Sequence, residues 1–382
     1  MPLGIYVHIP FCVRKCLYCD FLSFPAGEEE KSAYVEALLR EIDGAAAKFG
    51  IEAGDAQIGS IYIGGGTPGC LDTVYINKIL CKLDEIYGPF SEATEITIEI
   101  NPAVGELTKL KGLSELGINR LSIGLQSANE DELRLLGRIH DREAFKACFE
   151  SAREAGFSNI NVDIMTALPG QTGEKLNTTL CLLKELSPDH ISAYSLIIEE
   201  GTPFYDMYTG EGEKLLPSEE EERSLYWQVR DTLTGLGYGH YEISNFAKPG
   251  FESRHNTSYW KRIPYLGLGL GASGLINETR YKNTDDMRTY LRASGERSSI
   301  AEALSLSGKD RMEETMFLGL RMREGVSMSS FYADFGVSLR EIYGEELERL
   351  RAQGLISILK DRVFLTDKGT DYGNYVFSRF LL

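Results

Sequence analysis

Residues 95–100 read EITIEI, a run in which polar side chains alternate with isoleucines. Because successive side chains of a β-strand point to opposite faces, Glu95, Thr97 and Glu99 share one face and the isoleucines share the other. Residues 161–165 (NVDIM) alternate in the same way. Strands of a doubly wound sheet, which helices cover on both faces, read instead as nearly continuous apolar runs. The alternation therefore favours a barrel with a polar, ligand-holding lumen.

Six short β-branched runs recur along the first half of the chain, and helix-like segments separate them. The predicted strands are residues 4–8, 58–63, 95–100, 120–124, 159–165 and 190–196. The predicted helices include residues 28–48, 71–87, 142–155 and 174–186. Strands that alternate with helices are typical of a parallel α/β architecture.

The pattern changes twice after these units. From about residue 200 it becomes irregular and rich in turns, and from about residue 306 three helix-like segments precede a hairpin-like run at 356–366, as in a winged-helix domain. Residues 308–382 carry 11 Lys plus Arg and 12 Asp plus Glu, so we expect a structural or partner-docking role for them rather than DNA reading. We predict a barrel (1–235), an extension (236–305) and a winged-helix-like C-terminal domain (306–382).

Composition narrows the class of protein. The 382 residues are 43% hydrophobic and 25% charged, which is typical of a folded globular protein. The net charge of −17 argues against nucleic acid as a partner. The N-terminus has no basic leader, and the longest apolar stretch, residues 265–276, is too short and too rich in glycine to cross a bilayer. We expect a cytoplasmic protein with at most peripheral membrane contact.

Three of the seven cysteines lie together in residues 8–21, HIPFCVRKCLYCDF, with the spacing CxxxCxxC. Cys12, Cys16 and Cys19 lack a fourth ligand at zinc-finger spacing, and three thiolates suit a four-iron cluster with one iron open. Structural zinc and idle thiols are the alternatives.

Other polar or glycine-rich features also follow predicted strands. Gly64, Gly65 and Gly66 end the second strand, where they allow either a tight turn or close approach of a ligand to the backbone. Further candidates at strand ends are Glu99, Asn101, Gln126 and Asp163. Barrel enzymes carry their working residues at this rim, and buried charges need partners. A cationic, hydroxyl-rich ligand such as S-adenosylmethionine would supply them.

Six motifs together resemble the radical S-adenosylmethionine superfamily, in the branch that contains anaerobic coproporphyrinogen III oxidase and the HemW heme chaperones. They are HIPFCVRKCLYC (8–19), IYIGGGTP (61–68), TIEINP (97–102), LSIGLQS (121–127), LLGRIH (135–140) and DIMTALPGQT (163–172). The resemblance implies a partial (β/α)6 barrel, and a [4Fe-4S] cluster on Cys12, Cys16 and Cys19 whose open iron chelates S-adenosylmethionine. It also implies binding-site residues for S-adenosylmethionine and a second ligand: Tyr6, Tyr18, Gly65, Gly66, Thr67, Glu99, Gln126, Arg138, Asp163 and Ile197.

Two features distinguish the groups within this branch. The oxidase carries a further cysteine where this chain has Phe21, and it has a longer segment before the cluster loop. The run HNTSYW (255–260) matches the HNxxYW motif of the HemW group, which makes His255 a candidate heme ligand; a packed aromatic corner is the alternative. The chain departs from the HemW pattern at TALPGQT (166–172) and at Ser273, where relatives often have histidine.

The resemblance therefore predicts a heme chaperone with a [4Fe-4S] cluster, S-adenosylmethionine and heme as cofactors. Its expected partners are respiratory hemoproteins that accept the heme, with a homodimer possible. The alternative function is that of an oxygen-independent coproporphyrinogen III oxidase, which decarboxylates two propionates. Whether the chain is an enzyme stays open at this point.

Overall fold

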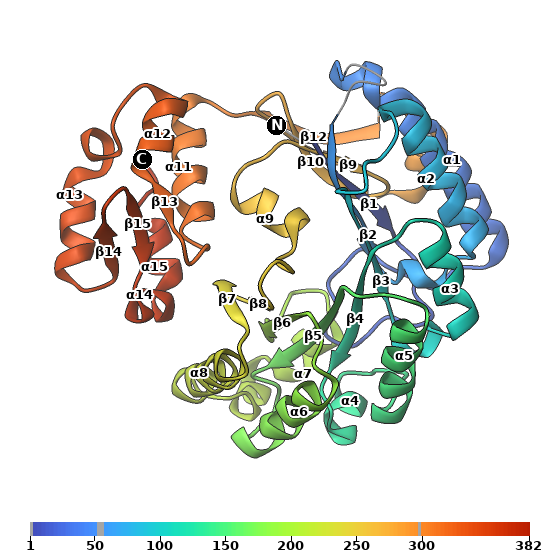
Figure 1. The fold of residues 1–382 in the computed structure, drawn as a ribbon, viewed down its shortest axis with the longest axis horizontal. Coiled ribbons are helices and arrows are strands. Elements are labelled where there is room, and N and C mark those ends of the chain that lie inside the picture. Colours follow the sequence, from blue (N-terminus) through green and yellow to red (C-terminus); the bar gives the residue numbers. More distant parts are fainter. Residues whose placement is uncertain (1–2, 52–56, 297–298) are drawn as a thin grey trace.

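The computed structural model describes residues 3–51, 57–296 and 299–382. Six parallel strands form a partial barrel in chain order, as predicted (Figure 1). They are β1 (Leu3–Ile9), β2 (Ile58–Gly65), β3 (Glu95–Ile100), β4 (Arg120–Gln126), β5 (Ile160–Thr166) and β6 (His190–Ser195). All six predicted strands are present, with ends that differ from the predicted ones by one or two residues.

Helices cover the outside of this barrel. They are α1 (Glu28–Phe49), α2 (Thr73–Tyr87), α3 (Leu107–Glu115), α4 (Glu130–Leu135), α5 (Arg142–Glu154), α6 (Gly173–Leu186) and α8 (Glu219–Gly235). Helix α7 (Pro203–Tyr208) instead packs at the carboxyl end of the barrel, against Leu17 and Tyr18. Helix α1 buries Tyr34, Leu38 and Ile42, which lie four residues apart and so share one face. Helix α2 starts two residues later than predicted, because the Asp72 carboxylate accepts a hydrogen bond from Val74 N and caps the helix there.

Helix α8 occupies part of the region that the sequence suggested was irregular. Ser218 and Glu221 form a capping box at its start, and Leu225, Val229 and Leu233 form its buried stripe. The sequence analysis missed this helix because its buried residues recur only three times, four positions apart, between turn-rich segments.

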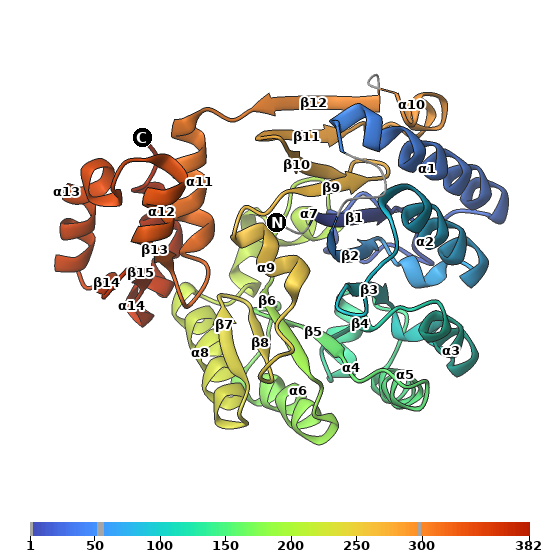
Figure 2. The same ribbon diagram turned by 45° about the horizontal axis from the view of Figure 1, so that its top comes forward.

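Residues 239–305 extend both edges of the same sheet. Strands β7 (Gly239–Glu242) and β8 (Asn245–Ala247) follow β6, while β9 (Tyr265–Leu268), β10 (Ser273–Ile276), β11 (Thr279–Asn283) and β12 (Ile300–Ser305) continue outward from β1. Helix α9 (Arg254–Trp260) connects the two edges and lies near the start of the chain (Figure 2), and α10 (Met287–Ala293) packs against α1. The predicted extension is thus continuous with the barrel sheet, and its boundary at residue 236 remains a proposal.

The C-terminal part has its own apolar core, separate from that of the barrel. It contains the three predicted helices α11 (Gly308–Gly319), α12 (Met328–Phe335) and α13 (Leu339–Ala352), followed by the predicted hairpin β14 (Ile356–Leu359) and β15 (Arg362–Leu365). Strand β13 (Val326–Ser327) pairs with β15, and α14 (Asp367–Asp371) and α15 (Gly373–Ser378) end the chain.

Charged groups join this part to the barrel sheet. The buried Glu314 of α11 accepts hydrogen bonds from Arg262 at 2.8 Å and from Arg280 at 2.5 Å. These two guanidinium groups hold the pKa of Glu314 below its usual value against the opposing effect of burial. In the part of the chain that the structure describes, no helix is long and apolar enough to cross a membrane.

Candidate functional site

A pocket of about 380 Å³ opens at the carboxyl ends of the barrel strands, and we call it the carboxyl-end pocket. Twelve of the fourteen residues predicted for the site line it: Cys12, Cys16, Tyr18, Cys19, Gly65, Gly66, Thr67, Glu99, Gln126, Arg138, Asp163 and Ile197. These residues come from segments up to 185 positions apart in the chain, between Cys12 and Ile197. Parallel strands bring them together because their carboxyl ends meet at one rim.

Backbone hydrogen bonds hold the cysteine loop in place. Cys12 N donates to Phe24 O at 3.1 Å, and Leu17 N donates to Leu136 O at 3.1 Å. The three cysteines are half-buried. Within the described residues, no three His, Cys, Asp or Glu side chains converge closely enough to hold a single metal ion. In a four-iron cluster each thiolate binds a different iron, so the three sulfur atoms need not converge on a single point.

Arg138 lies beside this loop. Its Nη1 is 3.6 Å from Cys16 Sγ, and its Nη2 donates to Gly124 O at 2.8 Å. The guanidinium group therefore ties the loop to β4 and places positive charge next to a cysteine sulfur.

The glycines at the end of β2 allow the cysteine loop to pack closely against the strand. Gly66 N donates to Ile9 O at 2.9 Å, which continues the pairing of β1 with β2 past the end of β2. A side chain at Gly66 would meet Phe11 O at 2.6 Å and Cys12 Sγ at 3.0 Å. Gly65 has a φ of 115°, a conformation that L side chains rarely adopt. The backbone of β2 thus lies directly against the cysteine loop.

Glu99 faces the pocket from the end of β3. Its Oε1 accepts from Tyr62 OH at 2.8 Å and its Oε2 accepts from Gly65 N at 3.0 Å. Burial raises the pKa of Glu99 to about 7, a larger effect than the opposing one of these hydrogen bonds, and the nearby Asp163 raises the pKa further. A cationic ligand would favour the charged form of this carboxyl group.

Asp163 lies on the next wall of the lumen. Ser122 Oγ donates to Asp163 Oδ2 at 2.9 Å and Asn161 Nδ2 donates to Asp163 Oδ1 at 2.8 Å, while burial raises the pKa of Asp163. Gln126 ends β4 with a φ of 66°, next to a register shift between β4 and β5. A left-handed residue other than glycine is strained, and such strain concentrates at functional sites.

Two predicted residues, Tyr6 and His255, do not line the carboxyl-end pocket. Tyr6 lies deeper in the lumen, where its ring stacks on Tyr62 at 6.3 Å and its hydroxyl is 3.0 Å from His8 Nδ1. His255 is fully buried, with Nδ1 2.8 Å from Ser60 Oγ and Nε2 2.7 Å from Tyr259 OH. Burial lowers the pKa of His255 to about 3, so the ring is neutral.

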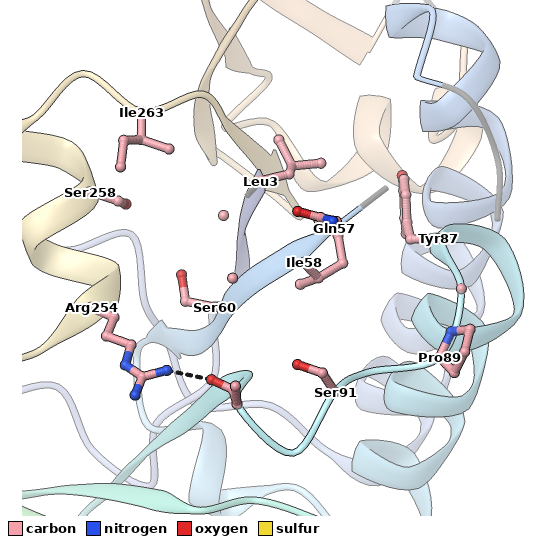
Figure 3. A pocket seen from close by; sticks show the side chains of 14 residues that line it. Leu3, Gln57, Ile58, Ser60, Tyr87, Pro89, Ser91, Arg254, Ser258 and Ile263 are labelled. Atoms are coloured by element: carbon pink, nitrogen blue, oxygen red, sulfur yellow. Dashed lines mark hydrogen bonds between the residues drawn. The ribbon is translucent and has the colours of Figure 1, made fainter. Parts of the chain in front are cut away.

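A second cavity of about 640 Å³, the amino-end cavity, opens at the opposite end of the barrel (Figure 3). Leu3, Ile58 and Ser60 line it from the strands, and Arg254, Ser258 and Ile263 line it from α9 and the residues that follow. Ser60 also contacts the His255 ring, so His255 lies just behind the wall of this cavity. The two cavities therefore lie on opposite sides of the aromatic layer that Tyr6, Tyr62 and His255 form.

The sequence analysis missed Tyr62, Ser122 and Tyr194, which also line the carboxyl-end pocket. The alternation of strand faces was sufficient to find two of them, since Tyr62 lies two residues before Gly64 and Ser122 lies two before Gly124. Tyr194 lies late on β6, which carries no motif.

Sequence comparisons agree with this geometry. The radical SAM superfamily profile matches residues 6–183, and the HemN C-terminal domain profile matches residues 306–372. The Heme chaperone HemW of Lactococcus lactis is 39% identical over 100% of this chain and 98% of its own length, and that of Bacillus subtilis is 38% identical over 98% of both chains. The chain belongs to the heme chaperone HemW family. The HemW of Escherichia coli is 32% identical over 100% of this chain and 98% of its own.

The fold of this HemW family member also matches a solved structure. Coproporphyrinogen III oxidase (HemN) from Escherichia coli, described as a radical SAM enzyme, superposes with a TM-score of 0.85 at 26% identity, over 100% of this chain and 90% of that one. The partial barrel and the C-terminal domain are therefore shared between the two groups of this branch. Membership of the radical SAM superfamily implies a [4Fe-4S] cluster and S-adenosylmethionine as cofactors.

Proposed function

We propose that this protein is a cytoplasmic heme chaperone that binds heme together with a [4Fe-4S] cluster and S-adenosylmethionine, and that delivers heme to respiratory hemoproteins. The observation that carries the proposal is similarity to HemW over the full length of both chains. The carboxyl-end pocket supports the part that concerns the cluster and S-adenosylmethionine, because it brings the cysteine loop and two half-buried carboxyl groups to one rim.

Cys12, Cys16 and Cys19 would hold the cluster. Their loop carries three half-buried thiols and a neighbouring guanidinium group, and Gly66, which has no side chain, lets the loop lie directly against the end of β2. When bound, the cluster supplies one-electron chemistry to a ligand at its open iron. Arg138 would hold the loop against β4, and Gly66 would hold Cys12 close to the end of β2.

Glu99 and Asp163 would bind S-adenosylmethionine. That ligand carries positive charge on its amino and sulfonium groups and has ribose hydroxyl groups, so it can neutralise one carboxylate and donate hydrogen bonds to the other. Gly65 and Thr67 would line its other side, while Gln126 and Tyr18 border the same space. Ile197, which is 67% exposed at the pocket mouth, would contact the second ligand.

Phe21 favours the chaperone over the oxidase. It occupies the position of the additional oxidase cysteine and lines the carboxyl-end pocket with 62% of its surface exposed. Phenylalanine has no thiol, so whatever chemistry that cysteine performs is absent here. An apolar ring at the mouth of the pocket is instead suited to a flat apolar ligand.

His255 remains our candidate for heme ligation. Both of its ring nitrogens already have partners, so ligation requires the contact with Tyr259 or with Ser60 to open. Because heme competes with these contacts for the ring nitrogens, His255 would release heme readily, as transfer to an acceptor requires. A homodimer is part of the proposal as well.

Two measurements on the anaerobically reconstituted protein test the function. Heme titration should produce a Soret shift, and incubation with coproporphyrinogen III, S-adenosylmethionine and reductant should yield no protoporphyrinogen. Conversion of coproporphyrinogen III over many turnovers would refute the chaperone assignment and establish the oxidase.

A further inference from the structure

Arg120 is an unusual residue in the barrel lumen. It begins β4, is 1% exposed, and is the largest fully buried side chain of the described residues. No hydrogen bond or ion pair joins its guanidinium group to any of those residues, and its Nε is a buried donor without a partner. A buried charge normally has a partner, because its removal from water is costly.

The strand register places Arg120 one step below the carboxyl-end pocket. Glu99 pairs with Ser122, and Thr97 pairs with Arg120, so each step along β3 matches a step along β4. Arg120 and Ser122 share the lumen face, and Ser122 donates to Asp163. Arg120 thus enters the lumen one layer below the residues that face the pocket.

Arg120 is the cation that acts on both of these carboxyl groups from within the lumen. It lowers the pKa of Glu99 and of Asp163, opposing the larger effect of burial on each. Hydrogen bonds from Tyr62 and Gly65 also lower the pKa of Glu99, and hydrogen bonds from Ser122 and Asn161 lower the pKa of Asp163.

We propose that Arg120 is a positioning residue that keeps Glu99 and Asp163 charged and ready for a cationic ligand. The proposal rests on the proposed binding of S-adenosylmethionine in the carboxyl-end pocket. Direct ion pairs would satisfy the carboxylates and compete with the ligand. A guanidinium group held one layer below supplies a favourable field and leaves their oxygens free.

Several other titratable groups face this part of the lumen, and the test must take them into account. From β1, β2, β3, β5, β6, β7 and α9 these are Tyr6, His8, Tyr62, Glu95, Asp163, His190, Tyr194, Tyr241, Glu242, His255 and Tyr259. Burial lowers the pKa of both histidines of the lower lumen, His190 and His255, so neither changes charge between pH 6.5 and 9. Burial raises the pKa of the tyrosines Tyr6, Tyr62 and Tyr241 above that range.

The experiment is anaerobic calorimetry of S-adenosylmethionine binding to the reconstituted protein between pH 6.5 and 9. Arg120→Met and Arg120→Gln remove the charge, Arg120→Lys retains it, and Arg153→Met is the control. Arg153 forms an ion pair with Asp189 at 2.8 Å and does not line the pocket. Iron content and circular dichroism verify that each variant is folded and loaded.

We expect Arg120→Met and Arg120→Gln to bind about eightfold more weakly at pH 6.5, because a rise of one unit in the pKa of Glu99 from about 7 lowers its ionised fraction at that pH by about this factor. Much of the loss should return at pH 9, where the carboxyl groups ionise without help. Arg120→Lys and Arg153→Met should stay within about threefold of the wild type. In a Glu99→Gln background, Arg120→Met should cause a smaller further loss, because the two residues act through one interaction.

The contrary outcomes are distinct from one another. Wild-type affinity in both neutral variants, or an equal loss at every pH, would overturn the role of Arg120. Failure of the wild-type protein to bind S-adenosylmethionine at any pH would instead overturn the proposed function.

Discussion

Glu95 and Glu99 lie on the same face of the same strand, yet their surroundings differ. Glu95 is 6% exposed and accepts hydrogen bonds from Arg254 N and His255 N, both at 3.1 Å, at the start of α9. Glu99 has one backbone donor and one tyrosine, and it faces a pocket. Positive partial charge at a helix start stabilises a carboxylate, so the charge of Glu95 is already compensated within the fold.

The difference indicates how the barrel separates structure from function. At the amino end, a later segment of the chain returns as α9 and supplies hydrogen-bond partners to Glu95 and Ser60. At the carboxyl end, the carboxyl group of Glu99 also has hydrogen-bond partners, but it faces the carboxyl-end pocket as well. A polar residue in the lumen is therefore a candidate for ligand binding only where no later segment of the chain covers it.

The largest effect is expected at the cysteine loop. Cys12→Ala, Cys16→Ala or Cys19→Ala should each abolish cluster reconstitution, because three thiolates are the minimum for this type of site. Iron and sulfide content and visible absorbance measure the loss. Cys70→Ala is the matched control, since Cys70 is half-buried close to the loop and its Sγ donates only to Phe11 O at 3.5 Å. A cluster that survives all three single changes would refute the assignment.

His255→Ala tests the amino end of the barrel. The change removes a fully buried ring with two hydrogen bonds, and we expect a loss of about 2–4 kcal/mol in the free energy of unfolding. If His255 also ligates heme, the Soret shift of the folded fraction should weaken. An unchanged heme spectrum together with lower stability would show that His255 only packs. Tyr259→Phe retains the His255 ring and removes only its hydrogen bond to the Tyr259 hydroxyl. It therefore separates the loss of a hydrogen bond from the loss of the ring that could ligate heme.

Glu99→Gln tests the carboxyl end. S-adenosylmethionine affinity should fall about tenfold or more, since hydrogen bonds to charged groups contribute about 1.5–3 kcal/mol. For the wild type, affinity should decline as the pH falls through about 7, the pKa of Glu99, because the protonated form lacks the charge. Calorimetry that shows unchanged affinity would make Glu99 structural.

The same variant should affect the stability of the cluster-free protein in the opposite direction. The folded-state pKa of Glu99, about 7, exceeds the unfolded value of 4.5, so the native state binds the additional proton between these pH values. Ionisation of Glu99 therefore lowers stability as the pH rises through this window. The stability advantage of Glu99→Gln over the wild type, measured as the free energy of unfolding, should be about 1–2 kcal/mol larger at pH 8 than at pH 5. This range allows for the partial exposure of Glu99. Urea unfolding at the two pH values measures this.

Glu95→Gln should have the smallest effect and should complete the comparison. Loss of the charge at the start of α9 should lower the free energy of unfolding by about 1 kcal/mol. S-adenosylmethionine affinity should stay within about twofold of the wild type, because no ligand reaches this carboxyl group. A loss of affinity as large as that of Glu99→Gln would remove the distinction between the two ends of the barrel.

Much of this architecture is determined by the local sequence. Strand periodicity predicted all six barrel strands, and the alternation in EITIEI correctly predicted a polar lumen, because the face of a strand residue depends only on its position in the strand. The cysteine spacing and the glycine run also predicted one rim of the barrel, since the carboxyl ends of parallel strands must meet there. Motif resemblance identified the HemW family.

Other properties depend on segments that are distant in the chain, and only the tertiary structure decided them. Strand periodicity places Glu95 and Glu99 on the same face and does not show that their partners differ, because the partners of Glu95 come from α9, which lies some 160 positions further along. The burial of His255 and the missing partner of Arg120 likewise depend on what the other strands bring into the lumen. Local sequence sets which way a side chain points, whereas its solvation and its partners depend on how the rest of the chain packs around it.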